Sequence, residues 1–64
     1  MENEVTSLLK NMAEQFHEAT NDAMKFESGN NSAGTRVRKA MQNIKSLAQS
    51  VRLEVQAQKN GVIA

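Results

Sequence analysis

The sequence predicts an all-α fold, an antiparallel helical hairpin that dimerises into a four-helix bundle or coiled coil. Three observations predict it: apolar residues at heptad spacing in both halves, a Gly- and Asn-rich segment between them, and the absence of proline. We expect a single domain over residues 1–64. Its first helix should cover about 2–28, its turn about 29–31 and its second helix about 32–60.

The first half places apolar residues at alternating steps of four and three, which is the spacing of a heptad seam. These residues are Val5, Leu9, Met12, Phe16, Ala19, Ala23 and Phe26. We expect them to face the second helix, with the two phenylalanines supplying most of the bulk. Met12, Met24 and Met41 are expected to fill gaps in the core.

The second half repeats the pattern with Val37, Met41, Ile44, Ala48, Val51 and Val55. Between the halves, Gly29 suits a left-handed helix end, and Asn31 or Ser32 can accept the free N–H groups that open a helix. Gly34 is an unfavourable residue inside the first helical turn. A connection this short predicts that the helices fold back antiparallel.

A chain of 64 residues is near the lower limit for a self-sufficient core. It has no cysteine for a disulfide and a single histidine, His17, so oligomerisation is the remaining support. Further apolar residues widen both stripes beyond what one partner helix covers: Leu8, Ala13, Ala40 and Leu47. We therefore expect a homodimer or a higher homo-oligomer.

The net charge of +1 hides a division between the halves. Six acids and two bases precede Gly29, which gives about −4, whereas six bases and one acid follow it, which gives about +5. Such asymmetry indicates either an anionic partner or pairing between the two halves.

Four bases recur at intervals of seven and form one edge of the second helix: Arg38, Lys45, Arg52 and Lys59. This row spans about 31 Å, comparable with the roughly 34 Å of one DNA turn. Arg36 and Lys39 add cations near the N-terminus of the helix, where free N–H groups favour a phosphate. The candidate DNA-binding residues are therefore Arg36, Arg38, Lys39, Lys45, Arg52 and Lys59.

Other function classes have little support in the sequence. His17 has no second histidine or cysteine nearby, and we expect neither catalysis, a metal, a cofactor nor a small-molecule substrate. No stretch approaches the roughly 18 apolar residues of a membrane span, and no leader-like apolar run opens the chain. We expect a cytoplasmic protein without membrane contact.

Residues 29–52, with the Gln-Lys-Asn-Gly that ends at Gly61, resemble the histone H1-like Hc1 family of bacteria. The most telling parts are the Arg-Val-Arg of residues 36–38 and the Ile-Lys-Ser-Leu-Ala of residues 44–48. The resemblance implies a nucleoid-associated protein that binds DNA without sequence preference and helps compact it. Better-known members of that family also have a long Lys- and Ala-rich tail that this sequence does not contain, so modest affinity is expected.

The basic residues of the second half also permit another function. The bases could instead pair with acids, in the first helix or on another protein, and the chain would then be an oligomeric structural or adaptor module.

Overall fold

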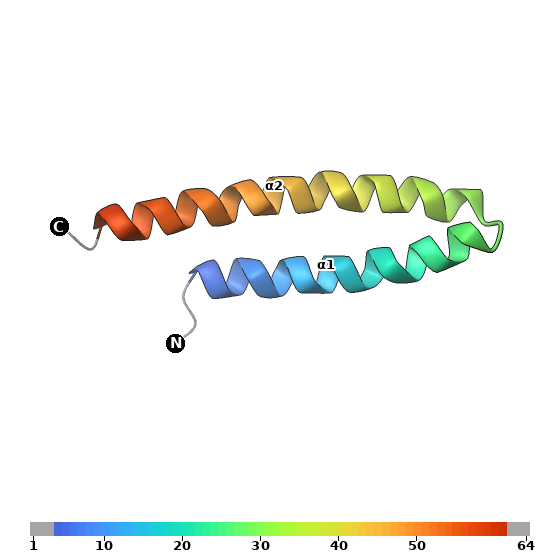
Figure 1. Ribbon diagram of the computed structural model, residues 1–64, viewed down its shortest axis with the longest axis horizontal. Coiled ribbons are helices and arrows are strands. Elements are labelled where there is room, and N and C mark those ends of the chain that lie inside the picture. Colours follow the sequence, from blue (N-terminus) through green and yellow to red (C-terminus); the bar gives the residue numbers. More distant parts are fainter. Residues whose placement is uncertain (1–3, 62–64) are drawn as a thin grey trace.

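A computed structural model describes residues 4–61 as two helices, α1 (Glu4–Glu27) and α2 (Asn31–Gly61). The helices run side by side in opposite directions, and α2 extends beyond the start of α1 (Figure 1). The predicted all-α hairpin is confirmed. The expected helical start at residue 2 lies outside the described residues.

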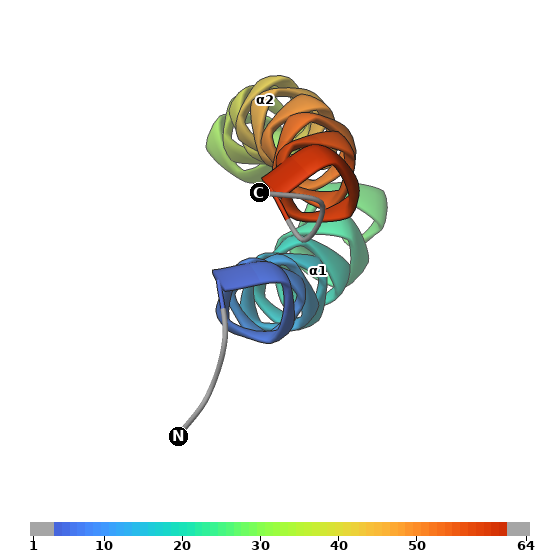
Figure 2. The same cartoon turned by 90° about the vertical axis from the view of Figure 1, so that its left-hand side faces the viewer.

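The hairpin is a thin slab whose principal extents are 54 × 20 × 10 Å. Figure 2, which looks along the slab from its open end, shows the two helices inclined to each other rather than strictly parallel. A slab of two helices has two broad faces. Within residues 4–61, neither helix has a stretch long and apolar enough to cross a membrane.

The turn ends α1 with a Schellman motif. The N–H of Asn30 donates to the carbonyl of Lys25 at 3.0 Å, and that of Gly29 donates to the carbonyl of Phe26 at 3.0 Å. Gly29 has a φ of +112°, which side-chain-bearing residues rarely adopt. The predicted role of Gly29 is therefore confirmed.

Asn30 also begins α2. Its Oδ1 accepts the N–H of Ala33 at 3.1 Å, which is the hydrogen bond of an N-cap. The sequence-based choice of Asn31 or Ser32 as the cap was wrong, because the helix already includes both residues. One residue thus closes the end of α1 and opens α2, which makes the turn as short as it is.

The seam between the helices follows a heptad pattern, but not the predicted one. In α1 the sheltered positions recur at Val5, Leu8, Met12, Gln15, Ala19 and Asp22. In α2 they recur at Ala33, Val37, Ala40, Ile44, Leu47, Val51, Glu54 and Gln58. Both rows still alternate steps of three and four, as helices packed along their length require.

The predicted seam was therefore correct at its centre and wrong at its edge. The large residues assigned to it are about half exposed, at 50% for Leu9, 50% for Phe16 and 48% for Phe26. Met41 and Val55 are likewise 41% and 37% exposed. Residues predicted to flank the stripe occupy the contact instead, namely Leu8, Ala40 and Leu47. The two phenylalanines do not supply the bulk of this seam.

The core of the hairpin is thin. Among residues 4–61, only Ala19, Ala33 and Ile44 are buried, with 5%, 0% and 8% of their surface exposed. Phe26 packs over Gly34, where an added Cβ would lie 2.5 Å from its ring. This close approach explains a glycine in the first helical turn. Three buried residues are few for a stable domain, so the hairpin needs further burial.

The double role of Asn30 gives a stability prediction. Asn30→Ala should lower the free energy of unfolding by about 1 kcal/mol, because the N-cap acceptor for Ala33 is lost. Asn31→Ala, one residue along and inside α2, is the matched control and should change stability little. Urea unfolding followed by circular dichroism at one fixed protein concentration measures both. An equal cost for the two variants would contradict the assignment.

Candidate nucleic-acid interface

One broad face of the slab is polar. Residues of both helices line a shallow depression there: Gln15, Glu18, Asp22, Arg36, Lys39 and Asn43, together with Ala19 and Ala40. We call this the polar face. It contains two of the six predicted DNA-binding residues, Arg36 and Lys39.

Arg36 is engaged within the hairpin. Its Nε donates to Oδ1 of Asp22 at 3.0 Å, and the Asp22 side chain is only 20% exposed. The pair joins the turn-proximal parts of the two helices and sets the level at which they face each other. Arg36 is therefore partly committed to the fold, as the alternative of pairing between the halves anticipates.

The opposite broad face is apolar. Viewed down α1, Asp22 lies about 60° to one side of the seam residue Ala19, on the polar face. Phe16 and Ala23 lie about 60° and 40° to the other side of Ala19, so they belong to the opposite face. In α2, Asn43 and Met41 lie on opposite sides of Ile44 in the same way. Residues seven apart share a side of a helix to within about 20°. We call this surface the apolar face; it comprises Leu9, Phe16, Ala23, Met41, Ala48 and Val55.

The other four predicted residues form one continuous row. All four are exposed: Arg38, Lys45, Arg52 and Lys59. The first three each lie three positions before a residue of the apolar face, and Lys59 follows Arg52 by seven. Three residues turn a helix through about 300°, so this basic row borders the apolar face along the outer edge of α2. Within residues 4–61 none of the four makes an ion pair.

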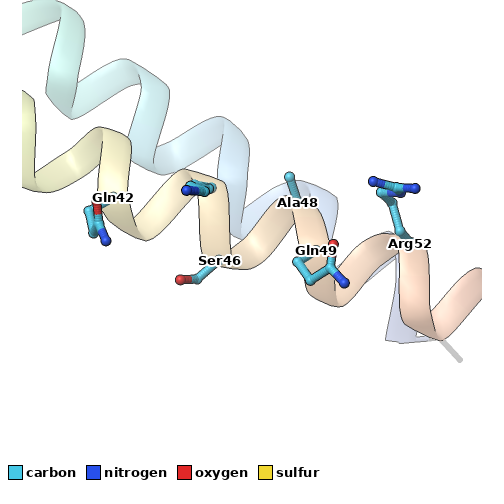
Figure 3. Close-up of a pocket in the computed structure, with 6 residues that line it drawn as sticks. Gln42, Ser46, Ala48, Gln49 and Arg52 are labelled. Carbon is cyan, nitrogen blue, oxygen red and sulfur yellow. The ribbon is translucent and has the colours of Figure 1, made fainter.

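A shallow groove runs along the basic row in the middle of α2. It is lined by Lys45 and Arg52 together with Gln42, Ser46, Ala48 and Gln49. Figure 3 shows Ala48 and Arg52 projecting to one side of α2, and Gln42, Ser46 and Gln49 to the other. The groove therefore combines cations with neutral hydrogen-bond donors.

Sequence reasoning missed the polar residues of this groove. Gln42 and Gln49 are seven apart, as Lys45 and Arg52 are, so the spacing that revealed the bases could have revealed the amides. Amide N–H₂ and hydroxyl groups bond to phosphate oxygens as guanidinium and ammonium groups do. The amides thus widen the set of donors that one backbone could meet.

Arg38 occupies the turn end of the row. It lines a second depression with Phe26, Asn31, Gly34, Thr35 and Val37. The half-exposed ring of Phe26 links this end of the basic row to the apolar face. Lys59 lies at the opposite end, in the last turn of α2. That end of α2 extends beyond the start of α1 (Figure 1).

The chemistry of the edge is that of an anion-binding surface. It presents ammonium, guanidinium, amide and hydroxyl donors in a line, and Glu18 and Asp22 lie on the polar face instead. His17 is exposed on α1, and no group of three acidic, histidine or cysteine residues within 4–61 could hold a metal ion.

Comparison with curated proteins and with solved structures gives no match. The model of one protein family, described as histone H1-like protein Hc1, matches residues 6–61. That range includes α1 from residue 6 onward, the turn, all of α2 and all six predicted DNA-binding residues. The match agrees with the resemblance seen in the sequence and extends it to α1. The chain therefore belongs to the histone H1-like Hc1 family, a family of DNA-binding nucleoid proteins.

Proposed function

We propose that this protein binds duplex DNA through its phosphates, without sequence specificity, and helps compact DNA in the nucleoid of the cytoplasm as a homodimer or higher homo-oligomer. The observation that supports this most is the basic row: four exposed bases at heptad spacing, without an ion pair inside residues 4–61. Membership of a histone H1-like family supports the same conclusion.

The form of the row suits a phosphate backbone. Arg38 and Lys59 are about 31 Å apart along α2, so the row is nearly as long as one DNA turn. A helix edge contacts backbone charges without entering a groove deeply, and such contacts fix position without reading bases. The function is structural, with no catalytic step.

The two remaining bases have a secondary role in this proposal. Arg36 and Lys39 lie on the polar face, so they do not contact the same backbone segment as the basic row. Arg36 would have to leave Asp22 to reach a phosphate. The basic row is therefore the principal DNA-binding surface.

Salt dependence tests the binding. Four phosphate contacts should reduce affinity about 100-fold between 50 and 200 mM salt, because each contact releases a condensed counterion. Arg38→Gln combined with Arg52→Gln should reduce the log–log slope by about 2 for each copy that touches the duplex. Fluorescence anisotropy of a labelled duplex measures both quantities. Absence of binding at low salt contradicts the proposal.

The two faces are compared by changing the same residue type on each. Lys45→Gln, in the basic row, should lower the salt slope by about 1, because one phosphate contact is lost. Lys39→Gln removes the same charge from the polar face, so it should change the slope much less. Equal effects would show that net charge, rather than the basic row, governs binding.

The adaptor alternative is favoured by one observation, the Arg36–Asp22 pair. An adaptor that pairs with acidic protein surfaces should bind poly-glutamate as tightly as it binds DNA of the same charge. We expect DNA to compete far better, since phosphate offers oxygens to guanidinium forks all along the row.

A further inference from the structure

We propose that two copies of this chain join through their apolar faces with α2 of each copy packed on α1 of the other, so that their basic rows lie on opposite edges and hold two DNA duplexes. The part concerning DNA rests on the proposed function. The packing of the two copies rests on the exposure of the apolar side chains, the register of the two helices and the position of the bases.

The hairpin leaves its bulkiest apolar edge outside its own seam. Leu9 and Phe16 are each 50% exposed, and Met41 is 41% exposed. Meanwhile the seam includes four half-buried polar residues: Gln15, Asp22, Glu54 and Gln58. Large contiguous apolar patches on a soluble protein mark an interaction surface. The apolar face is therefore built to be covered.

A second copy fits this surface in size. The broad face of the slab lies within an envelope of 54 by 20 Å, roughly 1,000 Å², which includes the part of α2 that extends beyond α1 (Figure 1). Stable interfaces bury about 800 Å² on each partner. A homodimer would also bury apolar surface of the exposed side chains, which the hairpin needs because only three of its described residues are buried.

Two face-to-face packings are possible for antiparallel hairpins. In the first, a twofold axis parallel to the helices places α2 over α1 of the second copy. In the second, a twofold axis across the helices places α1 over α1 and α2 over α2. Charge separates the two.

Register is compatible with the first packing. Asp22 faces Arg36 inside the hairpin, so residues whose numbers add to about 58 lie at one level. An axis parallel to the helices preserves that level in the second copy. It brings together two pairs from the apolar faces whose numbers add to 57: Phe16 with Met41, and Leu9 with Ala48. In the first pair two large side chains meet, and in the second a large side chain meets a small one, so the two apolar faces can pack closely.

Charge favours the first packing. With α2 on α2, the basic rows of both copies would share one edge, and like charges would repel along its length. With α2 on α1, Lys45 and Arg38 instead lie level with Ala13 and Thr20 of the second copy, which are uncharged. The two rows then occupy opposite edges of a bundle whose layers are 20 Å wide. Each edge is open to its own duplex.

Disulfide trapping tests the packing without DNA. The chain has no cysteine, so single-cysteine variants place one thiol on each copy. Leu9→Cys mixed with Ala48→Cys should form a disulfide between different copies, severalfold more than Leu9→Cys mixed with Met24→Cys. Met24 is 63% exposed and outside the apolar face, so it reports random collision.

The alternative packing gives a different product. Leu9 and Ala23 are each seven residues from Phe16, so α1 on α1 would favour a disulfide between Leu9→Cys and Ala23→Cys. That product, or a monomer by sedimentation at micromolar concentration, overturns the inference. Circular dichroism confirms that each variant is folded.

Bridging is measured by capture of a fluorescent duplex on an immobilised one. We expect severalfold more capture with the protein than without it, and loss of capture with Phe16→Glu, whose side chain lies outside the hairpin seam. Binding of single duplexes without capture overturns the bridging. A Leu9–Ala48 disulfide without any DNA binding supports the packing and counts against the proposed function alone.

Discussion

The structure depends on the turn at Ser28–Asn30, because it sets both the direction and the register of the two helices. The Schellman hydrogen bonds end α1, and the Asn30 side chain begins α2 without a spare residue between them. Asp22 and Arg36 therefore meet at 3.0 Å, and every position along α1 has a fixed counterpart on α2. This register fixes how the heptad rows of the two helices face each other. The positions of the basic row, the apolar face and the polar face therefore depend on the three residues of the turn. The same turn requires a glycine with positive φ at residue 29.

A seam of small residues has consequences for the whole molecule. Ala19, Ala33 and Ala40 let the helices approach closely, but they bury little apolar area. The larger side chains, including Phe16 and Met41, lie half outside the contact. The seam and the apolar face are neighbouring parts of one wide apolar stripe on each helix, and the hairpin covers only the seam. The hairpin therefore resembles one layer of a helical bundle more than a self-sufficient domain. The polar residues at the seam are tolerated where they find partners, as Gln58 does when it donates to Glu54 at 3.2 Å.

The sequence predicted the hairpin, the role of Gly29 and the family, but it placed the seam one edge away from its true position. The reason is that two heptad rows overlap. Val5, Met12 and Ala19 belong to both, and the step from Met12 leads either to Gln15 or to Phe16. Hydrophobicity favours Phe16, whereas the hairpin uses Gln15. In α2 the same ambiguity follows Ile44, where Leu47 lies in the seam and Ala48 at its margin. Periodicity defines the width of a stripe, and only the packing of one helix on another decides which edge each partner takes. For the candidate site, heptad spacing found the bases, but it could not show that Arg36 binds Asp22 across the turn.

Segregation of charge explains how a protein of net charge +1 can present a basic surface. Glu18 and Asp22 lie on the polar face beside Arg36 and Lys39, whereas the basic row follows the outer edge of α2 and makes no ion pair within residues 4–61. At physiological salt the Debye length is about 8 Å, so the field at the row depends mainly on the charges within that distance of it. A phosphate near Lys45 or Arg52 therefore responds to the local bases rather than to the total charge. Sequence arithmetic over the whole chain conceals this, because folding, and not composition, decides which bases meet an acid: Arg36 pairs with Asp22, whereas the basic row makes no ion pair within residues 4–61.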